Sequence, residues 1–89
     1  MVRADHDFAA EKGNWSYFVV ANRGVAIRPM PTFAFPEGTK EGPKQNEKCK
    51  VSARLKVGRT AFLKLADGTG WIFDTNREGR LVCREEGTV

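Results

Sequence analysis

Hydrophobic and polar positions alternate most clearly in the middle of the chain. Between residues 48 and 57, apolar residues occupy every second position and Lys, Ser or Arg occupies the others. A period of two is typical of a half-buried β-strand or strand pair. The earlier segment 15–21 is dense in aromatic and β-branched residues, which favours another strand.

Shorter apolar segments separated by turn residues continue the same pattern. They predict strands at residues 25–28, 60–66, 69–74 and 81–84. No segment shows apolar residues at the 3.6-residue period of a helix. Five or six short strands with closely spaced turns predict an all-β fold, a small five- to six-stranded barrel.

The strongest hairpin signal is the pair Asp67 and Gly68, which stands between two apolar segments. If these two residues form the turn, counting outward pairs Lys64 with Trp71 and Phe62 with Phe73. Paired side chains share a face of the sheet. One face therefore carries three aromatic rings and one lysine, with Lys64 placed for a cation–π contact with Trp71.

The opposite face of this hairpin is aliphatic and is predicted to be the core face. Its members are Leu63, Leu65 and Ile72. The aromatic face then has two interpretations. The N-terminal strand or a loop covers it as a second small core, or it stays open as a surface for a peptide, sugar or base.

The chain is predicted to form one domain flanked by a segment without regular structure at each end. We predict a mobile leader over residues 1–13, a barrel domain over 14–86 and a tail over 87–89. Within the domain, residues 32–47 form a long charged loop with two prolines and two glycines. A loop of this length in so small a domain is usually either functional or disordered.

The order of strands and motifs resembles bacterial-type Src-homology-3 (SH3b) domains. The opening of that family is similar to residues 17–20 (YFVV) and 25–29 (VAIRP). Its closing hairpin is similar to residues 62–65 (FLKL), 67–68 (DG) and 70–72 (GWI). The resemblance implies a five- or six-stranded, partly open barrel that serves as a binding module for cell-wall peptides or protein partners.

Two features depart from the family pattern. The segment 31–47 is longer and more charged than the family's compact loop, and residues 74–80 are inserted before the last strand. The acidic, tyrosine-rich motif that eukaryotic relatives use on proline-rich peptides is absent, which argues against PxxP ligands.

The charge of the chain is unevenly distributed. The 89 residues carry a net charge of +4, but residues 40–64 hold eight lysines and arginines against two glutamates, a local +6. Four of these cations fall on one face of a predicted strand: Lys48, Lys50, Arg54 and Lys56. This basic strand face is either a solvated surface that protects a sheet edge or a footprint for a polyanion such as single-stranded nucleic acid.

The sequence gives little support for catalysis or for metal binding. The single histidine, His6, lies in the predicted leader, and with Cys49 and Cys83 it has no zinc-ligand spacing. We therefore expect no enzymatic activity, no metal and no cofactor. The two cysteines are expected to be small, buried apolar residues. The longest apolar run is too short to span a membrane, and no signal peptide is visible, so we expect a cytoplasmic location.

These observations predict a non-catalytic module that binds a protein or peptide. It would act as a monomer or as part of a larger protein. The predicted ligand-binding residues are Tyr17, Phe62, Lys64, Trp71 and Phe73. The alternative is single-stranded nucleic-acid or other polyanion binding through the basic strand face.

Overall fold

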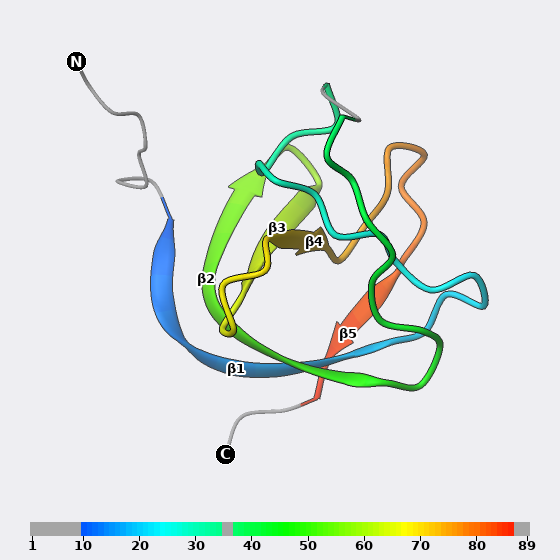
Figure 1. Ribbon diagram of the computed structural model, residues 1–89, viewed down its shortest axis with the longest axis horizontal. Helices are drawn as coiled ribbons and strands as arrows, with labels where there is room; N and C mark the ends of the chain where they lie inside the picture. The colour runs from blue at the N-terminus through cyan, green and yellow to red at the C-terminus, as the bar shows by residue number, and fades with distance from the viewer. Residues whose placement is uncertain (1–9, 35–36, 87–89) are drawn as a thin grey trace.

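The computed structural model describes residues 10–34 and 37–86, which form a five-stranded antiparallel sheet in the order β4-β3-β2-β1-β5 (Figure 1). The predicted all-β class is confirmed. The sheet is curled into a half-barrel because the long strands β1 and β2 bend along their length (Figure 1). In this part of the chain no helix is long and apolar enough to cross a membrane. The strands are β1 (Glu11–Val19), β2 (Lys48–Val57), β3 (Thr60–Leu65), β4 (Trp71–Phe73) and β5 (Cys83–Glu85).

Strand β1 begins inside the predicted leader. Glu11 pairs with Arg54 and Lys12 with Ala53, so the leader boundary at residue 13 is wrong for the segment 11–13. The sequence shows no apolar pattern for this part of the strand, because its side chains are all exposed and polar residues occupy it. A register shift follows between Lys12 and Trp15. Residues 1–9, including His6, and the tail 87–89 lie outside the described residues.

The predicted strand at residues 25–28 is reduced to two isolated bridges. Ile27 pairs with Lys40, and Arg28 pairs with Trp71 at the free edge of β4. The ladder stops there because Pro29 has no backbone N–H to donate. A side chain at Gly70 would lie 2.6 Å from the Arg28 carbonyl oxygen, so glycine is what allows this close approach.

The central hairpin has the predicted register. Phe62 pairs with Phe73 and Lys64 with Trp71, as counting from the turn indicated. The turn itself is wider than predicted, because the strands close at the hydrogen bond from Leu65 N to the Gly70 carbonyl oxygen. One extra residue joins the turn on each side, so the pairing is unchanged.

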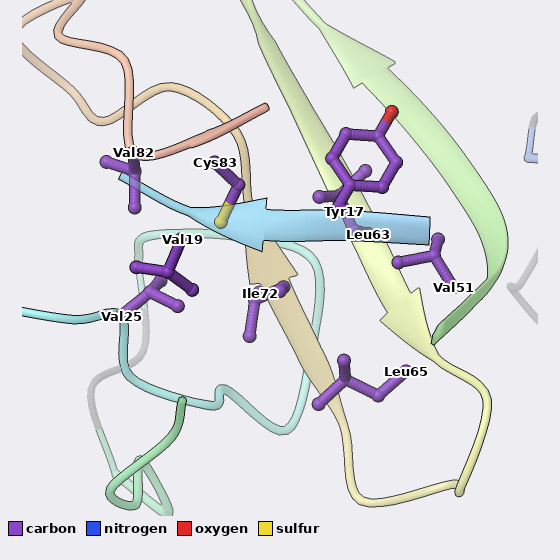
Figure 2. Packing of buried hydrophobic residues seen from close by; sticks show 9 residues of the cluster. All are labelled: Tyr17, Val19, Val25, Val51, Leu63, Leu65, Ile72, Val82 and Cys83. Carbon is purple, nitrogen blue, oxygen red and sulfur yellow. The ribbon is translucent and has the colours of Figure 1, made fainter. Parts of the chain in front are cut away.

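The concave side of the sheet holds the hydrophobic core (Figure 2). Leu63 and Ile72 have no exposed surface, and Leu65 is 7% exposed, which confirms the predicted aliphatic face. Cys83 is also buried there, whereas Cys49 is only half-buried. The core cluster comprises Tyr17, Val19, Val25, Val51, Leu63, Leu65, Ile72, Val82 and Cys83.

Burial of Cys83 predicts a pH dependence of stability. Burial raises the pKa of the Cys83 thiol from 9.0 to about 12, so the folded protein keeps its proton at pH values where the unfolded chain loses it. The free energy of unfolding should therefore fall as the pH rises above about 9, with a slope approaching about 1.4 kcal/mol per pH unit for one proton.

Urea unfolding of the protein and of Cys83→Ala, measured at several pH values from about 8 to about 10, checks this linkage. The variant should lose much of the pH-dependent decline, although Cys49, whose pKa burial also raises, contributes in the same direction. An equally steep decline in both proteins would contradict the assignment to Cys83.

Candidate functional site

The convex face of the β3–β4 hairpin carries the predicted aromatic residues. Pairing between the strands places Phe62 beside Phe73 and Lys64 beside Trp71. Trp71 also forms a bridge with Arg28 on its other side. Four of the five predicted ligand-binding residues therefore lie on one face of the sheet, as the pair Phe62–Phe73 next to the pair Lys64–Trp71.

Phe33, from the long loop, covers part of this face. Its ring centroid lies 5.0 Å from that of Phe62 and 4.9 Å from that of Phe73. Phe62 is only 2% exposed, so of the two interpretations of this face, cover by a loop holds for Phe62 rather than an open surface. The three rings form a compact group, here called the aromatic cluster, of which Phe33 is the outermost member added by the loop.

Arg28 fixes the position of Phe33. Its backbone pairs with Trp71, and its guanidinium donates a hydrogen bond of 3.3 Å to the Thr32 carbonyl oxygen. The Thr32 hydroxyl accepts a bond from Ala34 N, which tightens the loop around Phe33. The Arg28 Cζ atom lies 5.3 Å from the Phe33 ring centroid, within cation–π range. The β4 edge thus holds the loop that carries the ring.

A hollow of about 450 Å³ opens beside the aromatic cluster. Val57, at the end of β2, is 51% exposed there, and Arg77 lies over the Phe33 ring at 5.7 Å from its centroid. The volume falls within the range of about 300–1,000 Å³ common for ligand sites. The lining residues of this Phe33 hollow are Pro31, Thr32, Phe33, Ala34, Val57, Thr60, Phe62 and Arg77.

Lys64 and Trp71 lie near the hollow but do not line it. The Lys64 ammonium is 5.9 Å from the Trp71 ring centroid, which confirms the predicted cation–π contact. Trp71 is half-buried and Lys64 is exposed. Trp71 also pairs with Arg28. The Lys64–Trp71 pair therefore lies beside the segment that runs from Arg28 to residues 31–34, which line the hollow.

Tyr17 does not join the predicted site. Its ring is 4% exposed and belongs to the core cluster on the concave side (Figure 2). Its hydroxyl accepts a hydrogen bond of 3.0 Å from Arg54, and burial raises the pKa of its phenol. Tyr17 thus packs in the core, apart from the four other predicted ligand-binding residues.

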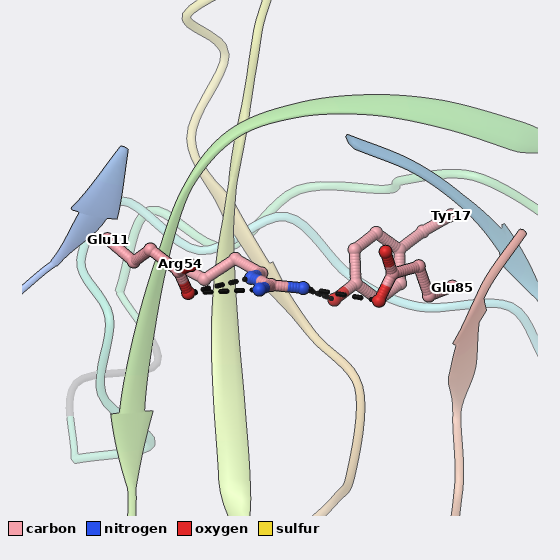
Figure 3. A network of polar contacts seen from close by, with 4 residues as sticks. All are labelled: Glu11, Tyr17, Arg54 and Glu85. Carbon is pink, nitrogen blue, oxygen red and sulfur yellow. Dashed lines mark hydrogen bonds and ion pairs between the residues drawn. The ribbon is translucent and has the colours of Figure 1, made fainter. Parts of the chain in front are cut away.

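Arg54 is also committed to the fold rather than free for a polyanion (Figure 3). Its guanidinium contacts a Glu11 carboxylate oxygen at 2.9 Å and a Glu85 oxygen at 3.2 Å. It also lies 3.9 Å from the Trp15 ring centroid, and its side chain is only 23% exposed. Arg54 therefore links β2 to β1 and β5, and its guanidinium is already paired with two carboxylates.

The rest of the basic strand face is divided. Lys48 forms an ion pair of 2.7 Å with Glu86, whereas Lys50 and Lys56 are exposed. Two of the four predicted cations are thus neutralised by carboxylates within the sheet. The prediction that the four cations share one face is wrong, because a register shift between Val51 and Ala53 interrupts the alternation. Val51 and Arg54 pair with the core-face residues Leu65 and Leu63, so Lys48 and Lys50 lie on the opposite face from Arg54 and Lys56.

Among residues 10–34 and 37–86, no cluster of three or more His, Cys, Asp or Glu side chains is arranged to hold a metal ion. Comparison with known proteins adds no relative: the chain matches no family model, no curated protein and no solved structure. The site is therefore interpreted from its own geometry.

Proposed function

We propose that this chain is a non-catalytic binding module that recognises a peptide segment of a protein partner, with the Phe33 hollow as the main contact. The observation that carries the proposal is an open hollow beside a paired hairpin, lined by apolar and aromatic side chains together with Thr32, Thr60 and Arg77. Phe33 supplies a partly exposed ring that packs on the buried Phe62, and Val57 supplies exposed aliphatic surface. An apolar side chain of a peptide is the chemistry that such a hollow accommodates.

The way the hollow is constructed supports recognition rather than simple core filling. Phe62 is held in register by β2 and β4, and Phe33 is held over it through Arg28. The rings are thus in place before a ligand arrives, which reduces the entropy lost on binding. The resemblance to bacterial-type Src-homology-3 domains, a family of binding modules, points to the same class of function.

The alternative of single-stranded nucleic acid is less well supported by the geometry. Stacking of bases needs exposed ring faces beside free cations. Phe62 is covered by Phe33, and Arg54 on the basic strand face is held by two carboxylates. The hollow, in contrast, remains open to a side chain.

Selection from a random peptide library on the immobilised protein tests the proposal. The variant Val57→Gln should weaken binding of selected peptides by about tenfold, because a polar amide replaces apolar surface in the hollow. Leu81→Gln is the matched control, since Leu81 is also 51% exposed but lies outside the hollow. Its affinity should stay within about twofold of the parent.

Two outcomes would contradict the proposal. If the library yields no peptide that binds above background, peptide recognition is contradicted. Selected peptides that lose affinity with Leu81→Gln but not with Val57→Gln would place the site elsewhere, in the cleft between residues 21–26 and 73–82 that Leu81 lines. Far-ultraviolet circular dichroism of both variants confirms that they remain folded.

A further inference from the structure

Two arginines contact the Phe33 ring at the hollow. Arg77 lines the hollow, and its Cζ atom lies 5.7 Å from the Phe33 ring centroid. The Arg28 Cζ atom lies 5.3 Å from the same centroid. The ring at the hollow is thus accompanied by two positive charges.

No ion pair between described residues reaches these two arginines. The ion pairs in this part of the chain join Glu11, Glu85, Glu86 and Glu41 to other cations. No Asp or Glu among the described residues lines the hollow. The acidic residues nearest in sequence, Glu37 and Glu78, are exposed and outside the lining.

Arg28 shows most clearly that the positive charge near the hollow lacks a carboxylate partner among the described residues. It is half-buried, one nitrogen donates to the Thr32 carbonyl oxygen, and its Nε has no hydrogen-bond partner among the described residues. Removing a guanidinium from water without a carboxylate nearby is unfavourable. An anion supplied by a partner at this arginine would offset part of that cost, because charge-assisted hydrogen bonds to arginine are strong.

We infer that the partner segment is an acidic peptide with an apolar anchor: its apolar side chain enters the Phe33 hollow, and flanking Asp or Glu carboxylates contact Arg77 and Arg28. This inference rests on the proposed function and adds the chemistry of the ligand. The apolar contact would supply most of the affinity, and the carboxylates would set specificity and raise the association rate.

Fluorescence anisotropy with three short labelled peptides tests the inference. The first alternates Asp and Glu around a central Leu-Phe pair, the second replaces each acid by Asn or Gln, and the third replaces the Leu-Phe pair by Ala-Ala. The first peptide should bind at least about tenfold more tightly than either of the others. Its advantage over the amide peptide should shrink as salt is added, since exposed charges are screened.

A charge-reversal pair locates the acidic contact. Arg77→Glu should weaken binding of the first peptide by about tenfold or more, with a much smaller effect on the amide peptide. Arg84→Glu is the matched control, because Arg84 is an exposed arginine on β5, and no residue of β5 lines the hollow. It should change the affinity by less than about threefold through long-range charge alone.

The outcomes separate this inference from the proposed function. If library-selected neutral peptides bind the hollow and the acidic peptide has no advantage, peptide recognition stands and the acidic ligand is overturned. Tighter binding of an oligothymidylate than of the acidic peptide, weakened by Arg77→Glu, would assign these arginines to nucleic acid and also overturn the inference. If neither the library nor any of the three peptides gives binding, the proposed function itself fails.

Discussion

Truncation of Leu63 or Ile72 to alanine is expected to lower the free energy of unfolding by about 2–5 kcal/mol. Both side chains have no exposed surface, and they face each other across the β3–β4 hairpin in the core cluster. Removing either one leaves a cavity between the two strands that also carry Phe62 and Phe73. In a domain this small, such a loss is a large fraction of the total stability.

Urea unfolding followed by circular dichroism measures this effect, with Met30→Ala as the control. Met30 is 52% exposed and should change the free energy of unfolding by no more than about 0.5 kcal/mol. If the Leu63 and Ile72 variants unfolded at the same urea concentration as the Met30 variant, the concave side of the sheet would not be the core.

Replacement of Arg54 by alanine is expected to lower the free energy of unfolding by about 1–3 kcal/mol. The largest loss is at Tyr17, whose buried hydroxyl would no longer have Arg54 as its hydrogen-bond donor. The contact with the Trp15 ring is lost as well. The ion pair with Glu11 adds little, because that carboxylate is 62% exposed.

Two further variants make the Arg54 prediction specific. Lys56→Ala, on the same strand but exposed, should be nearly neutral. Arg54→Lys should recover only part of the stability, since an ammonium group lacks the planar fork that reaches Tyr17, Glu11 and Glu85 together. A loss from Arg54→Ala no greater than that from Lys56→Ala would contradict a structural role for the network.

The β3–β4 hairpin could be predicted in detail because its information is local. Asp67 and Gly68 mark a turn, and alternation on both sides then fixes which side chains share a face. The extra turn residues did not alter this result because one was added on each side. Gly68, with a φ of 83°, adopts the left-handed backbone conformation expected of a turn glycine.

The site itself could be predicted only in part. The aromatic face of the hairpin followed from register, and cover by a loop was one of its two interpretations. The loop has no periodicity, so nothing singled out Phe33 as the residue that covers Phe62. Arg28 was visible only as the end of a short apolar segment. Its role depends on a single bridge to Trp71, and pairing between distant segments is not encoded in either segment alone.

The basic strand face could not be predicted correctly for a similar reason. The register shift between Val51 and Ala53 separates Lys48 from Arg54, and their acidic partners come from other strands or chain ends. Counting charges along the sequence treats these cations as free. The cations that remain beside the hollow, Arg28 and Arg77, lie in loops that the charge count did not single out.

The most direct test of the central claim is an amide chemical-shift map of the isotope-labelled protein titrated with a library-selected peptide. A peptide seated in the Phe33 hollow should shift the amides of residues 32–34, 57–62 and 77, with smaller changes at Arg28 and Trp71. The amides of Lys48, Lys50 and β5 should stay in place. Shifts concentrated instead on Lys48, Lys50 and Lys56, with residues 32–34 unmoved, would contradict a binding site at the hollow.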